Sequence, residues 1–81
     1  MPVVFRRGGL SYFFYSNEGQ PSEPAHVHIR GGGGDAKVWL EPEVSMADNY
    51  GFKPRQLSNI LRTVVENRER FLRAWHDHFS N

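Results

Sequence analysis

The chain has 81 residues, a formal net charge of +1 and no cysteine, with 38% hydrophobic and 14% aromatic residues. This length predicts a single domain over residues 1–81, near the size at which one core gives only marginal stability. The absence of cysteine excludes disulfides, thiolate catalysis and cysteine-ligated zinc. No apolar run approaches the roughly 20 residues of a membrane span, and the N-terminus does not resemble a signal peptide, so we expect a cytoplasmic protein without membrane contact.

Two β-hairpins are predicted in the first half of the chain. Residues 1–7 and the aromatic segment 10–16 flank Gly8-Gly9, a short turn signal. Residues 17–24 form a loop by composition. Segments 25–30 and 35–40 then flank the run Gly31–Gly34, which lacks the Lys-Ser/Thr of a phosphate-binding loop and predicts a second hairpin turn.

The second half predicts a helix that covers one face of the sheet. Residues 43–53 read as irregular, with at most a short turn of helix, and Pro54 fits a first helical position. Apolar residues then recur at three- and four-residue spacing: Leu57, Ile60, Leu61, Val64, Phe71, Leu72, Trp75 and Phe79. Arg68 falls inside this stripe, so either the helix breaks near Glu66-Asn67 or Arg68 is drawn inward to a carboxylate or a backbone carbonyl. The predicted fold is α+β, with a three- or four-stranded antiparallel sheet under one long C-terminal helix.

The segment Glu23–Arg30, EPAHVHIR, holds two of the four histidines. Because side chains alternate along a strand, His26, His28 and Arg30 share one face and the apolar residues between them share the other. The apolar face should meet the helix, which leaves both imidazoles on the wetter face. Pairing through the glycine turn places Lys37 and Trp39 on that same face.

Four interpretations of this face stay open, and one of them is simple binding through the histidines. The histidines can be the polar side of a strand, or a metal site, which needs a third ligand from His76, His78, Asp77, Glu23 or Asp35. They can also act in acid–base catalysis on RNA without metal or other cofactor, with Arg30 or Lys37 stabilising the transition state. His76 and His78 themselves suit the negative end of the helix dipole.

The run Tyr12–Tyr15 places aromatic rings on both faces of its strand. The face away from the helix is therefore partly aromatic, as in a homodimer contact or a base-stacking surface. Trp75 and Phe79 fit the core better than a ligand platform.

Several stretches occur together: RRGGLSYFFYSNE, PAHVHIR, AKVWLEP, the GF before the helix, and AWHDHF. In this order and spacing they resemble a bacterial family described as domain of unknown function 4160, over nearly the whole chain. The shared pattern matches His26, His28, Lys37, Trp39, Trp75 and His76. One departure is Ala25, which stands where the family typically has the second of two prolines.

The resemblance implies a small cytosolic protein, often encoded beside another small protein in a toxin–antitoxin-like pair, and it assigns no catalytic residue. We therefore expect one member of such a pair, with a cognate protein partner, acting on RNA through His26, His28, Arg30, Lys37 and Trp39. If it is an enzyme, it is a metal-independent ribonuclease that uses its histidines. The alternatives are a non-enzymatic interaction module, such as an inhibitor of a host or phage complex, and a histidine-based metal-binding protein.

Overall fold

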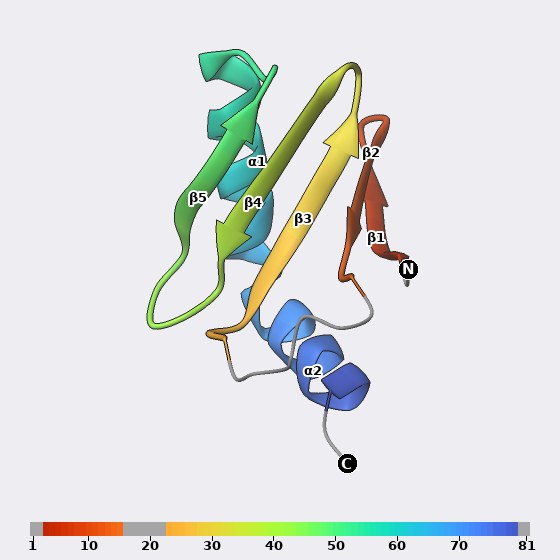
Figure 1. Cartoon of the computed structure of the whole chain (residues 1–81), viewed down its shortest axis with the longest axis vertical. Helices are drawn as coiled ribbons and strands as arrows, with labels where there is room; N and C mark the ends of the chain where they lie inside the picture. Colours follow the sequence, from red (N-terminus) through yellow and green to blue (C-terminus); the bar gives the residue numbers. More distant parts are fainter. Residues whose placement is uncertain (1–2, 16–22, 80–81) are drawn as a thin grey trace.

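A computed structural model describes residues 3–15 and 23–79 and shows one antiparallel sheet followed by two helices (Figure 1). The strands follow the chain order in space: β1 (Val3–Arg7), β2 (Leu10–Phe13), β3 (His26–Gly31), β4 (Gly34–Trp39) and β5 (Ser45–Tyr50). Helices α1 (Pro54–Glu66) and α2 (Arg68–Phe79) complete the fold. The predicted α+β class is confirmed. Most of the loop predicted over residues 17–24 lies outside the described residues.

Strand β5 corrects the prediction of an irregular segment over residues 43–53, and it raises the strand number above the expected three or four. It pairs with β4 through contacts such as Lys37↔Asp48, with a register irregularity between Lys37 and Val38. Four of its six residues are polar or small, and its side chains are mostly exposed. An edge strand of this kind buries too little to show the alternating pattern that identifies strands in a sequence.

The glycines make both predicted hairpin turns. Gly8 and Gly9 have φ values of 59° and 79°, and Gly32 and Gly33 have 56° and 82°. Such paired left-handed residues match the twist of antiparallel strands, and glycine adopts them without steric cost. The outer glycines of the four-residue run are not turn residues: Gly31 and Gly34 pair with each other at the ends of β3 and β4.

The long helix is interrupted at Asn67, whose side-chain amide donates to the Thr63 carbonyl at 2.8 Å. Directly after it, Arg68 turns inward, and its Nε donates to the Leu40 carbonyl at 2.8 Å. Both alternatives weighed for Arg68 are therefore realised together. The break lets a charged side chain sit in an apolar stripe, because its guanidinium satisfies a carbonyl at the end of β4.

The core lies between the sheet and the two helices. Val27, Ile29 and Val38 are fully buried from the sheet side, as are Ile60, Val64 and Phe71 from the helices. The predicted core role of Trp75 is confirmed, and Phe79 packs against the same cluster. Among the described residues, neither helix has the length and apolarity needed to cross a membrane.

Candidate functional site on the open face of the sheet

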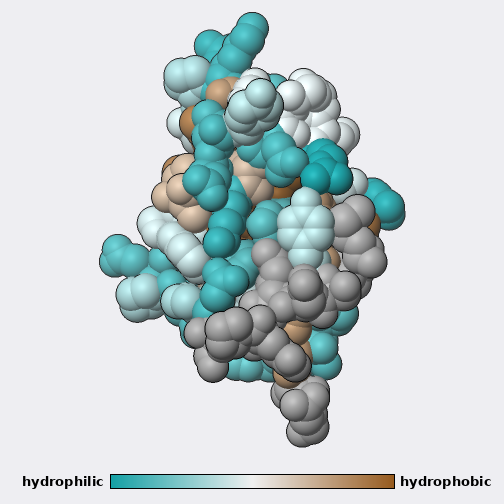
Figure 2. Space-filling view, in the orientation of Figure 1, coloured by the Kyte–Doolittle hydropathy of each residue, from teal (hydrophilic) through white to brown (hydrophobic). Residues whose placement is uncertain are grey.

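Neither of the two described helices covers the second face of the sheet, which is turned toward the viewer in Figure 1. The strand register arranges its side chains in rows that cross the strands. One row is Phe13, His28, Lys37 and Asp48, and the next is Ser11, Arg30, Asp35 and Tyr50. Because Lys37 and Trp39 pair with His28 and His26, they lie on the histidine face as predicted. Figure 2 shows that the visible described residues over these strands are mainly hydrophilic.

The centre of this face is a shallow hollow of about 260 Å³. It is lined by Tyr15, His28, Asp35, Ala36, Lys37, Asp48 and Tyr50. The His28 imidazole stacks on Phe13 with 5.6 Å between ring centroids, and Tyr15 meets it edge-on at 4.6 Å. His28 is half-buried, so its ring is packed on its neighbours yet still reachable from the hollow.

The aromatic character of this face is only partly accessible. Phe13 and Tyr15 point away from the helices, as the alternation along β2 predicts. Phe13 is nevertheless buried, with 1% of its surface exposed, beneath neighbours that include His28 and Arg30. The predicted base-stacking platform is therefore wrong for Phe13, whose buried ring packs against His28.

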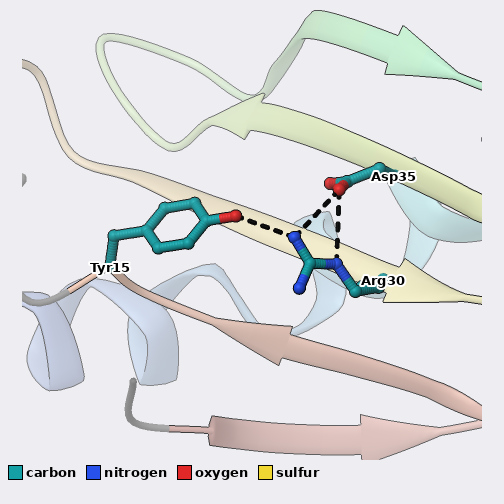
Figure 3. Close-up of polar contacts among 3 residues, drawn as sticks. All are labelled: Tyr15, Arg30 and Asp35. Atoms are coloured by element: carbon teal, nitrogen blue, oxygen red, sulfur yellow. Dashed lines mark hydrogen bonds and ion pairs between the residues drawn. The ribbon is translucent and has the colours of Figure 1, made fainter.

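Arg30 is bound on two sides (Figure 3). Its Nε and one terminal nitrogen donate to the same oxygen of Asp35 at 3.3 and 3.1 Å. A terminal nitrogen also donates to the Tyr15 hydroxyl at 2.8 Å. The bonds to Asp35 are the main cause of a raised Arg30 pKa, to which Tyr15 adds. The guanidinium is thus oriented and partly neutralised before any ligand arrives.

Lys37 is also engaged. Its ammonium lies 3.4 Å from a Glu23 carboxylate oxygen and 4.4 Å from the centroid of the Trp39 ring. Asp48, its cross-strand neighbour, makes no hydrogen bond or ion pair with the residues that the structure describes. The free charge of the hollow is therefore a carboxylate and not a cation.

His26 corrects the expectation that both imidazoles are on the wet side. It is completely buried, with its ring centroid 4.9 Å from that of Trp75 and 5.4 Å from that of Trp39. Its Nδ1 lies 3.0 Å from the Pro24 carbonyl, which assigns the proton to Nδ1 because a carbonyl only accepts. His26 is the first residue of β3, and this end of the strand is the one nearest α2 in Figure 1. Trp75 of α2 contacts the His26 ring there.

The metal alternative finds no third ligand in the described parts of the chain. No group of three or more His, Asp or Glu side chains there is placed to hold an ion. Two candidates are already paired, Asp35 with Arg30 and Glu23 with Lys37. His76 and His78 are exposed on α2.

The structure adds two residues that the sequence did not single out, Asp48 and Tyr50. Both come from β5 and reach the hollow because β5 pairs with β4. The sequence contains only a weak signal for them, an aromatic residue, Tyr50, directly after the polar Asp48 and Asn49 in a segment predicted to be irregular.

Comparison with known proteins gives one match. The family model described as "Domain of unknown function (DUF4160)" matches residues 9–76, a span that contains every residue of the hollow. No curated protein and no solved structure is similar enough to match.

Proposed function

The chain belongs to the DUF4160 family, and we propose that it is a non-enzymatic binding module of a cytoplasmic toxin–antitoxin-like pair, which engages the second small protein of the pair through the open sheet face. The partner follows from the two-gene context that the family resemblance implies. The binding mode follows from the chemistry of the hollow.

The observation that carries the proposal is the state of the two cations. Arg30 is held by Asp35 and Lys37 by Glu23, while Asp48 adds another negative charge beside them. An RNA phosphate would have to displace a carboxylate from each cation and would meet a third carboxylate. RNA affinity depends on cations that are available to phosphate, so this face is poorly suited to it.

A protein partner suits the same face better. Tyr50 is 81% exposed, and Tyr15 and Arg30 present an oriented hydroxyl and guanidinium beside it. Tyr and Arg are enriched among the residues that dominate protein interfaces. The unpaired Asp48 specifies the complementary group, a Lys or Arg side chain of the partner that enters the hollow.

Binding of the co-encoded small protein, measured by calorimetry with both proteins purified, tests the proposal. Asp48→Lys and Tyr50→Ala should each weaken binding by at least about tenfold, because they remove the carboxylate and the exposed ring of the interface. Arg55→Ala, an exposed change at the start of α1, is the matched control and should leave affinity unchanged. Equal affinities for all four proteins would contradict the proposal. Sedimentation of the chain alone shows whether two copies associate, and loss of that association in Tyr50→Ala would assign it to the same face.

Catalysis on RNA is the second candidate, and one observation favours it: His28 lies in the hollow close to Tyr15 and beside Lys37. This candidate predicts that His28→Ala abolishes growth inhibition on expression while the circular dichroism spectrum is unchanged. Undiminished growth inhibition by that variant would eliminate it. Since His26 is buried, a two-histidine mechanism would also require β3 to part from Trp75.

A further inference from the structure

A larger groove lies on the other side of the sheet, between the β1–β2 hairpin and α1. Its volume is about 480 Å³, within the range of small-molecule sites. Its lining is Arg7, Gly8, Leu10, Tyr12, Gln56, Asn59, Ile60, Arg62, Thr63 and Glu66. Tyr12, Ile60 and Thr63 are buried and form its floor, whereas the charged residues are exposed and form its rim.

The rim carries available positive charge. A guanidinium nitrogen of Arg7 lies 3.6 Å from a carboxylate oxygen of Glu66, the only acidic residue among the described residues that line the groove. Arg62 makes no ion pair or hydrogen bond with the residues described in the structure. Arg70 adds a third guanidinium close by, since both it and Arg7 lie over the Phe5 ring at 5.3 and 5.1 Å. The described lining therefore holds two guanidinium groups and one carboxylate, and the Arg70 guanidinium lies near Arg7 outside it.

The floor supplies a different chemistry. Tyr12 stacks on Phe71 at 5.7 Å, and the rings of Phe5 and Tyr12 meet edge-on, so a fixed and almost fully buried aromatic layer lies beneath the groove. The most accessible apolar side chain of the lining is the half-buried Leu10. A hydrogen bond joins Tyr12 to Thr63. The exposed amide of Asn59 offers a donor and an acceptor at the rim.

From this arrangement we propose that the groove binds a small organic anion, a molecule with a flat apolar body and one phosphate or carboxylate. The body packs against the accessible part of Leu10, above the buried Tyr12 and Ile60, and the anionic group bonds to the Arg62 guanidinium, whose fork matches both anions. The site is independent of the proposed partner interface, which lies on the opposite face of the sheet. The residues of the groove can bind a phosphate or a carboxylate equally well. The experiment therefore tests both anions.

The test is NMR titration of the ¹⁵N-labelled full-length chain at low salt with two pairs of probes. Adenosine monophosphate is compared with adenosine, and 2-naphthoate with 2-naphthamide, so that each pair differs only in the anionic group. At least one anion should shift the backbone amides of Asn59, Arg62 and Thr63 saturably, and its neutral counterpart should bind at least about tenfold more weakly. The anion that binds identifies the ligand as a phosphate or a carboxylate.

Three variants separate a built site from general attraction to a basic protein. Arg62→Ala should weaken binding by about tenfold or more, whereas Glu66→Gln should tighten it, because the change removes a repulsive charge and releases Arg7. Arg55→Ala removes the same charge from the same helix outside the groove and should have no effect.

Two results would overturn the proposal: no saturable shift of the groove amides with either anion, or equal losses in Arg62→Ala and Arg55→Ala. All three variants change exposed side chains, so a matched thermal melt is expected for each and verifies that a loss of binding is not a loss of fold.

Discussion

The open sheet face and the groove beside α1 both present arginine to solvent, but in opposite states. On the open face, Arg30 is fixed by Asp35 and Tyr15. In the groove, Arg7 forms an exposed ion pair with Glu66, and Arg62 has no partner among the described residues. Arg30 is therefore a preorganised part of the open face, whereas Arg62 is available to a ligand.

This difference shows why a count of basic residues does not locate an anion site. The chain has ten basic and nine acidic residues, which by itself predicts nothing about phosphate. The strand register decides the matter on the open face, because it places Asp35 directly opposite Arg30. In the groove, Glu66 is the only carboxylate among the described lining residues, so their net charge is positive.

The largest effect is expected from the two histidines, which share the open face but differ in burial. His26→Ala removes a completely buried ring from contact with Trp75 and Trp39 and should lower the free energy of unfolding by about 2–4 kcal/mol. His28→Ala removes a half-buried ring and should cost about 1 kcal/mol or less. Urea denaturation of both variants measures the difference.

His26→Phe is the matched control, since it keeps an aromatic ring in the cavity but loses the hydrogen bond to Pro24. It should be more stable than His26→Ala. Equal stabilities of His26→Ala and His28→Ala would show that α2 does not cover His26 in solution.

The sequence predicts turns, helices and hairpin register well, because these depend on residues that are close together in the chain. Gly8-Gly9 and Gly32-Gly33 specify their turns locally, and the apolar spacing after Pro54 specifies the helices, including the anomaly at Arg68. The register of the β3–β4 hairpin follows from its turn, so the row containing His28 and Lys37 could also be predicted.

What it misses depends on contacts between distant segments. His26 is buried because Trp75, which is remote in the sequence, reaches the end of β3. Asp48 and Tyr50 join the hollow only through the pairing of β5 with β4, and an exposed edge strand carries no apolar pattern. The groove arises from the placement of α1 beside the hairpin, which neither segment encodes alone.

The comparison of the two arginine regions can be tested by removing the carboxylates that pair with the cations of the open face. The double variant Glu23→Gln/Asp35→Asn releases Lys37 and Arg30 from their carboxylates. Affinity for a short RNA at low salt, measured by fluorescence anisotropy, should rise by about tenfold or more, because two cations become available to phosphate.

The double variant Glu69→Gln/Asp77→Asn makes the same change in net charge on exposed positions of α2. It should raise RNA affinity much less. If both double variants gain equally, net charge and not the pairing of Arg30 and Lys37 limits RNA binding on this face.

The smallest effect concerns the floor of the groove. Burial raises the pKa of the Tyr12 phenol, more than the hydrogen bond with Thr63 and the charge of Arg7 lower it. Because the folded state keeps this proton above pH 10 while the unfolded chain loses it, Tyr12 contributes stability that is complete below about pH 10. That stability declines as the pH rises further, by at most about 1.4 kcal/mol per pH unit.

Tyr12→Phe should lower the free energy of unfolding by about 0.5–1.5 kcal/mol near neutral pH, because the hydrogen bond is lost, and it should reduce the decline of stability at alkaline pH. Urea denaturation at about pH 8 and about pH 11 measures both effects, with Tyr50→Phe as the control because that side chain is exposed. An alkaline decline that is the same in Tyr12→Phe and in the parent chain would mean that the Tyr12 hydroxyl already contacts water, and the groove would then have a wet floor instead of the apolar one on which the anion site depends.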